Sequence, residues 1–295
     1  MRKFMAQVER LLGRPEDRRR FPPSPRALED DSNVFCAGNA SSRHARSLWI
    51  SIAPQETKVC NSPVRRAIAC VNAVAIFCSV AGFSALQAWA MQLYPGGTWW
   101  DRAALGHRFW ENYICDLEWE VALGGSPNHV GSRVARAAVL VLVAGFVPFW
   151  LALPALFPGR PRTGSAVRAL GLASVAGLFA VAWMPSDRAG ALHGAAVITA
   201  SVPGMAATGL AVAGLLDGEP RPRVAGWTGA TLLGFAAADL ALYVSHLVRH
   251  VEGTPLVVVL EKIAVLLLLA WMLEVGARIL PPLDGRADRS AYLAR

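Results

Sequence analysis

The sequence predicts an all-α integral membrane protein built as a bundle of six transmembrane helices. Of the 295 residues, 54% are hydrophobic and only 17% are charged, which is not the composition of a water-soluble domain. The hydrophobic residues form six blocks of about 20 residues, the length that a helix needs to cross the ~30 Å hydrocarbon core of a bilayer. The blocks lie at roughly 67–91, 134–157, 166–184, 191–216, 225–248 and 255–277.

The residues before the first block, 1–63, are predicted to form a disordered basic tail. They include the run Arg18, Arg19 and Arg20 and show no sustained apolar period, so they offer little surface to bury. They do not resemble a signal peptide, because the first apolar block begins late and is too long. An over-extended gene start, with translation beginning near Val64, is the alternative. The transmembrane domain is expected over 64–278, followed by a short basic cytoplasmic tail over 279–295.

The distribution of charge predicts the partners and the topology. Residues 1–66 contain 13 Lys and Arg against 7 Asp and Glu, whereas the remaining residues contain 16 against 14. The net charge of +8 therefore belongs mainly to the tail, which favours membrane lipids and not nucleic acid as the partner. Arg and Lys near the spans number eleven on the side of the termini and six on the other. Both termini are therefore predicted to be cytoplasmic, with the long connection after the first helix outside.

The composition also indicates the type of organism and the class of protein. Arg outnumbers Lys by 26 to 3 and alanine is abundant, which favours a GC-rich bacterial genome and a multi-pass protein of the inner (plasma) membrane. The five cysteines include no CxxC pair, so neither a zinc ribbon nor a disulfide framework is predicted. The chain also lacks a P-loop, a Rossmann glycine pattern, GxSxG and HExxH. No cofactor is expected from these patterns.

The connection between the first two blocks, 92–133, is far longer than a turn, and long ordered loops are usually functional. Two interpretations remain open for it. In the first, an amphipathic helix lies on the outer surface, with Phe109, Tyr113 and Leu117 along one side. In the second, the connection is a lid over a polar pocket, with Asn112 and Asp116 directed inward.

The third, fourth and fifth blocks contribute polar residues at the predicted outer level. Asp187 precedes the fourth block and His193 opens it, and the fourth block is rich in glycine, which favours close helix packing. In the fifth block Asp239, Tyr243 and His246 stand at i, i+4 and i+7, and His250 follows at i+11. This spacing places all four on one helical face.

A charged side chain in the hydrocarbon costs roughly 2.5–3.5 kcal/mol on insertion scales, so Asp239 needs a partner or water. Lys262 in the sixth block is the natural candidate, because it is predicted at a similar depth, with Glu261 beside it. The three residues indicate either a structural ion pair with a protonated Glu261 or a proton-titrating site.

The spacing of His246 and His250 allows both imidazoles to reach one metal ion. With His193 they would hold zinc, and Asp116 or Asp239 would act as base toward a zinc-bound water. The alternative is that these histidines lie at the membrane interface and form hydrogen bonds with loops.

The stretch Asn112 to Leu117 reads Asn-Tyr-Ile-Cys-Asp-Leu. It resembles the Asn-aromatic-Ile-Ser-Asp-Leu signature of an uncharacterised family of six-pass bacterial membrane proteins, a domain of unknown function distantly related to DRAM/FRAG/Sfk proteins. Cys115 stands where that family has Ser, and the resemblance extends over 65–277. It implies six helices and an outward-facing polar cluster, but no activity. A looser resemblance to alkaline-ceramidase-like hydrolases, which use Ser, Asp and three His around zinc, is limited by their seven helices.

These observations favour a membrane protein without catalysis that interacts with lipids or handles a small solute. The alternatives are a zinc-dependent intramembrane hydrolase and a proton-coupled transporter that uses Asp239, Glu261 and Lys262. The ligand would be a small molecule or a lipid. The predicted functional cluster comprises Asn112, Asp116, Asp187, His193, Asp239, Tyr243, His246, His250 and Lys262.

Overall fold

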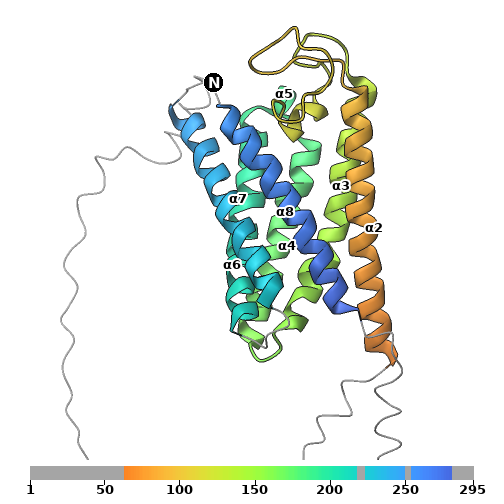
Figure 1. Cartoon of the computed structure of the whole chain (residues 1–295), viewed down its shortest axis with the longest axis vertical. Coiled ribbons are helices and arrows are strands. Elements are labelled where there is room, and N and C mark those ends of the chain that lie inside the picture. Colours follow the sequence, from red (N-terminus) through yellow and green to blue (C-terminus); the bar gives the residue numbers. More distant parts are fainter. Residues whose placement is uncertain (1–62, 218–222, 250–253, 281–295) are drawn as a thin grey trace, which may run out of the picture. The chain divides into compact units, whose positions relative to one another are not determined.

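The computed structural model describes residues 63–217, 223–249 and 254–280 of the chain (Figure 1). These residues are helical apart from turns and two isolated β-bridges, and they include no strand. Six helices are long and apolar enough to cross a membrane, so the predicted class is confirmed and the chain is a multi-pass membrane protein. The long helices are α2 (Pro63–Leu93), α3 (His129–Ala152), α4 (Pro161–Trp183), α6 (Ala191–Leu216), α7 (Arg223–Arg249) and α8 (Pro255–Ile279).

Short helices occupy the connections. A 3₁₀ helix (Ile114–Glu118) lies in the long connection between α2 and α3, a second one (Leu153–Leu156) ends the second span, and α5 (Ser186–Ala189) joins α4 to α6. Figure 1 shows the long connection and α5 at the same end of the bundle. We name this end the outer end, after the side predicted from the charges. The predicted disordered tail and the cytoplasmic tail lie, except for their edges at Pro63 and residues 279–280, outside the described residues.

Proline residues begin three of the spans. Pro63, Pro161 and Pro255 each stand in the first turn of a helix, where the missing N–H is not needed by the helical ladder and the fixed φ suits the helix. Pro148 and Pro203 instead lie inside α3 and α6, as expected from their blocks. Such interior prolines are tolerated in membrane spans because neighbouring groups satisfy the freed carbonyl.

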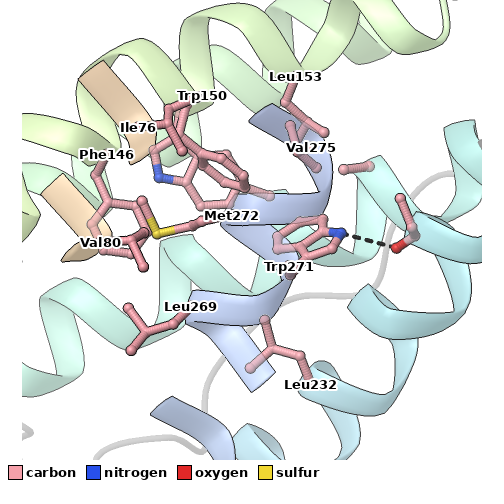
Figure 2. Close-up of a cluster of buried hydrophobic side chains, with 14 of the residues drawn as sticks. Ile76, Val80, Phe146, Trp150, Leu153, Leu232, Leu269, Trp271, Met272 and Val275 are labelled. Carbon is pink, nitrogen blue, oxygen red and sulfur yellow. Dashed lines mark hydrogen bonds between the residues drawn. The ribbon is translucent and has the colours of Figure 1, made fainter. Parts of the chain in front are cut away.

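Buried aromatic side chains from α3 and α8 form the core of the inner half of the bundle (Figure 2). The ring of Trp271 lies edge-on to Phe149, at a centroid distance of 5.2 Å, and to Trp150, at 6.2 Å. The Trp271 indole N–H donates to the carbonyl of Ala225 at 2.9 Å, which ties α8 to the start of α7. Lipid tails are as apolar as these side chains, so packing and such hydrogen bonds, rather than exclusion of water, hold the helices together.

Glycines allow the helices to approach closely. The most extensive helix contacts are those of α2 with α3 and of α4 with α6, and α7 packs between α6 and α8. A Cβ atom at Gly177 in α4 would lie 2.3 Å from the backbone N of Ala200 in α6, and one at Gly171 would lie 2.3 Å from the Trp150 ring. The backbones of α4 and α6 therefore touch at Gly177, and the Trp150 ring packs against α4 at Gly171. In the glycine-rich fourth block, a Cβ atom at Gly204 would lie 2.9 Å from the Ser174 hydroxyl of α4.

The Gly177→Ala substitution is expected to destabilise the bundle by about 1–3 kcal/mol, because the new methyl group forces α4 away from the backbone of α6. Thermal unfolding of the purified protein in detergent micelles measures the effect. Gly234→Ala in α7 is the matched control, since a Cβ there meets no atom within 4 Å. Equal melting temperatures for the two variants would contradict the close approach of α4 and α6.

Candidate functional site

The connection over residues 94–128 folds into an ordered structure at the outer end, which we call the outer cap. Gly97 (φ +90°) allows its tightest turn: the Gly97 N–H donates to the carbonyl of Ala104 at 2.7 Å, and a Cβ atom at Gly97 would lie 2.1 Å from the backbone N of Gly124. Tyr94 is buried, and its hydroxyl accepts the N–H of Leu123 at 3.0 Å. These contacts join the beginning and the end of the connection within the outer cap.

The outer cap contains no amphipathic α-helix, so that interpretation of the sequence is wrong. Only Ile114–Glu118 is helical, in one short 3₁₀ segment. In place of helical hydrogen bonds, side chains accept the backbone N–H groups of the cap. The Asn112 side-chain oxygen accepts the N–H of Arg108 at 3.0 Å, and the Asp116 carboxylate accepts the N–H of Tyr113 at 2.8 Å. Asn and Asp compete with helix hydrogen bonds in this manner. Asn112 and Asp116 are both buried, and their side chains form hydrogen bonds within the outer cap. A lid over a polar pocket stays a prediction.

Lys262 connects the outer cap to α8. Its side chain is 1% exposed, and its ammonium donates to the backbone carbonyl of Asn112 at 2.7 Å and to the Glu261 carboxylate at 2.9 Å. The ammonium also lies 5.6 Å from the centre of the Phe109 ring, within the range of a cation–π contact. Glu261 in turn accepts the N–H of Ile114, at 3.1 Å. Glu261 and Lys262, which are adjacent in α8, thus bind a backbone N–H group and a backbone carbonyl of the outer cap, respectively.

Asp239 in α7 is close to the residues that the sequence predicts, but its hydrogen bonding differs from the prediction. It interacts electrostatically with Glu261 and Lys262, so the structure brings the three predicted residues together. However, the Lys262 ammonium forms its hydrogen bonds with Asn112 and Glu261, and the expected Asp239–Lys262 hydrogen bond is absent among the described residues. The Asp239 Oδ1 atom is buried and has no hydrogen-bond partner there.

Two tyrosines complete the surroundings of Asp239. Tyr113 of the outer cap and Tyr243 of α7 each interact electrostatically with both Asp239 and Glu261. The Tyr243 hydroxyl lies 3.5 Å from the position that a Cβ of Gly194 would occupy, which brings α6 to the same place. We call this group the Asp239 cluster, and it comprises Tyr113, Asp239, Tyr243, Glu261 and Lys262.

Asp187 belongs to a second polar group, at the contact between the outer cap and α5. Its carboxylate accepts the N–H of Glu120 at 3.1 Å. Glu120 pairs with Arg136, at 3.4 Å, and with Arg188, and Trp119 donates its indole N–H to Ser186 at 2.6 Å. Asp187 thus anchors the cap to α5, and it also interacts electrostatically with His193, which in turn interacts with Glu261 of the Asp239 cluster.

The three histidines of the predicted zinc site are only partly described. His193 is buried, and its Nδ1 lies 2.7 Å from the Met184 carbonyl. His246 is half-buried on α7, whereas His250 lies outside the described residues. Among the residues described, no group of three or more His, Cys, Asp and Glu side chains is arranged to hold a metal ion. The three-histidine zinc site stays a prediction.

Burial changes the acid–base properties of the outer cap. Desolvation raises the pKa of Asp116 to about 7, although the Tyr113 N–H and the Trp99 indole, at 3.1 Å, stabilise its carboxylate. Desolvation also raises the pKa of Glu118 to about 8, against the opposing charge of Arg136. Burial lowers the pKa of His107 to about 4, and the Lys262 charge acts in the same direction. The cap therefore carries two carboxyl groups that change charge near neutral pH.

Several polar residues of the cap were not singled out from the sequence. Glu118 and Asn128 are 1% and 3% exposed, and each has a buried side-chain oxygen with no partner among the described residues. Gln87 in α2 is 4% exposed, and both polar atoms of its side chain are in the same situation. The length and polarity of the connection indicate a functional segment, but no periodic pattern distinguishes buried from exposed residues in a structure made of turns.

The stability of the protein is expected to fall as the pH rises from about 5 to about 8.5. An unfolded Glu releases its proton near pH 4, whereas the folded state keeps the Glu118 proton up to about pH 8. The stabilisation is therefore complete below the unfolded pKa and is lost as the pH rises through the folded pKa. The Glu118→Gln variant should flatten this dependence and melt higher than the parent at about pH 8.5.

Melting temperatures measured in detergent across this pH range test the expectation. Glu111→Gln is the control, because Glu111 is 40% exposed and paired with Arg108, and it should keep the slope of the parent. A Glu118→Gln variant with an unchanged slope would show that Glu118 is ionised in the folded protein.

The chain was compared with protein-family models, curated proteins and solved structures, and nothing matches it. The resemblance of residues 112–117 to the six-pass family remains a prediction.

Proposed function

We propose that this protein handles a small polar solute in the bacterial inner membrane, binding it at the Asp239 cluster beneath the outer cap without chemical conversion. One observation carries the proposal: Asp239 Oδ1 is buried in a membrane span and lacks a hydrogen-bond partner among the described residues. A carboxylate oxygen in this position loses its water without compensation. An ionisable residue inside a membrane span is therefore a candidate functional site by default.

The neighbouring charged groups support this assignment, because each has partners within the protein. Lys262 and Glu261 bind each other and the cap backbone. Asp116 accepts hydrogen bonds from Tyr113, Trp99 and Asn112. Within the Asp239 cluster, Asp239 is the residue with a buried side-chain oxygen that has no hydrogen-bond partner among the described residues.

The placement of the outer cap favours a solute that enters from outside the cell. Ile114 and Asn112, which flank Tyr113, are both held by α8, so the cap lies directly over the cluster. The predicted topology, with both termini cytoplasmic, places this end toward the cell exterior. A solute would then reach Asp239 past the cap, and surrounding membrane lipids are the alternative source of a polar ligand.

Proton-coupled transport is a second candidate, and the proximity of Asp239 to the Glu261–Lys262 pair favours it. A buried carboxylate without a hydrogen-bond donor is neutralised most simply by a proton. If the solute and the proton compete for Asp239, a proton gradient would drive the exchange of one for the other.

The Asp239→Asn substitution is expected to weaken solute binding at least about tenfold, because it removes the charge that the ligand compensates. Purified protein is screened in detergent for thermal stabilisation by cationic, neutral and anionic small solutes, and the active ones are titrated against the variant. Asp217→Asn is the matched control, since Asp217 is exposed and pairs with Arg160 at the inner end. A panel without a single stabilising solute, or undiminished binding by Asp239→Asn, would refute the proposal.

Uptake of the active solute into proteoliposomes tests the second candidate. An imposed pH gradient should drive uptake by the parent protein and not by Asp239→Asn, which cannot bind a titrating proton at this position. Uptake that does not depend on the pH gradient, or that Asp239→Asn retains, would refute proton coupling. The proposal that the protein binds a solute would still stand.

A further inference from the structure

We propose that the ligand of the Asp239 cluster is an ammonium group, carried by a small primary amine or by an amine-bearing lipid headgroup. The inference rests on the proposed function and specifies its ligand. It follows from the charge left in the cluster, from the number of free acceptors and from the two tyrosines.

The first argument is the balance of charge. The Lys262 ammonium lies 2.9 Å from Glu261, so these two charges compensate each other. Asp239 adds a carboxylate that no further described cation pairs with. Electrostatic interactions are stronger in a buried site than in water. The cluster therefore selects a cation and repels phosphate, carboxylate and other anions.

The second argument is the number of available acceptors, which distinguishes an ammonium group from a metal ion. Hard cations such as calcium take six to eight oxygen ligands. The Glu261 carboxylate already accepts hydrogen bonds from the Ile114 N–H and the Lys262 ammonium. The Asp239 carboxylate and the hydroxyls of Tyr113 and Tyr243 are then the acceptors of the cluster that remain for a ligand. A primary ammonium has three donors, and this set of acceptors is adequate for it but too small for such an ion.

The third argument is the aromatic character of the cluster. Tyr113 of the outer cap and Tyr243 of α7 interact electrostatically with Asp239, and aromatic rings attract cations. The protein binds its own ammonium group in the same way nearby. Lys262 Nζ is held by a carboxylate, a carbonyl oxygen and the Phe109 ring, at 2.9, 2.7 and 5.6 Å. Asp239, Tyr113 and Tyr243 provide a carboxylate and two aromatic rings in the same cluster, and no hydrogen bond from a described cation reaches the Asp239 Oδ1 atom.

Ethanolamine hydrochloride is the probe for the first experiment, titrated into the full-length protein in a non-ionic detergent while the melting temperature is followed. Stabilisation by ethanolamine and not by acetate or glycerol is expected. Tetramethylammonium, which has no N–H donor, should bind at least about tenfold more weakly. Because both cations are compared on the parent protein, the result does not depend on the folding of a variant.

Two variants locate the site. Asp239→Asn should lose the ethanolamine response, Tyr243→Phe should weaken it severalfold by removing one acceptor, and Asp217→Asn should leave it unchanged. Stabilisation by acetate or glycerol alone would overturn the ammonium assignment while the proposed solute binding stands. Tetramethylammonium binding as tightly as ethanolamine would overturn the hydrogen-bonded mode, and an unaltered response of Asp239→Asn would overturn the location.

Reconstitution distinguishes the two sources of the ammonium group. The protein is placed in vesicles of phosphatidylglycerol or of phosphatidylethanolamine, and binding of radiolabelled ethanolamine is measured. Binding in phosphatidylglycerol that disappears in phosphatidylethanolamine assigns the site to the lipid headgroup, whereas equal binding in both assigns it to the free amine. No binding in either composition would overturn the proposal.

Discussion

The Lys262 ammonium is the interaction on which the outer half of the structure depends. It is almost completely buried, and a charge buried to this extent is retained only if every donor finds an acceptor. Glu261 provides one acceptor and the Asn112 carbonyl another. The outer cap must therefore keep Asn112 directly above α8, which in turn places Tyr113 and Ile114 over the cluster. Loss of the Asn112 contact would remove one of the two hydrogen-bond acceptors that the described residues offer to this buried ammonium.

The two halves of the bundle are stabilised by different means. In the inner half, Trp271, Trp150 and Phe149 fill the space between helices, and the indole of Trp271 is hydrogen-bonded to α7. In the outer half, buried polar side chains with unpartnered atoms, including Gln87, His107 and Asp239, accumulate in or below the cap. Polar groups of this kind are normally satisfied by ordered water or a ligand. The inner half is thus packed mainly by aromatic side chains, and the outer half carries most of the buried polar atoms that have no partner among the described residues.

The sequence predicted the six spans well because the bilayer imposes length and apolarity on every spanning helix. It also identified Asp239, Glu261 and Lys262 as neighbours, since their depth follows from counting residues along two helices. The hydrogen bonds of Lys262 could not be predicted in this way. Its acceptor Asn112 lies in a connection of turns, where no repeating pattern relates sequence position to direction, and the choice of Glu261 over Asp239 depends on that backbone.

The contacts that hold the cap to α8 recognise its main chain: Lys262 binds a carbonyl oxygen and Glu261 binds an N–H group. Main-chain groups are common to nearly all residue types, so this attachment is indifferent to the side chain at position 114, apart from proline, which lacks the N–H. Over evolutionary time the surface of the cap can change its residues and adapt to new surroundings, while the two groups on α8 keep it in register with the helices.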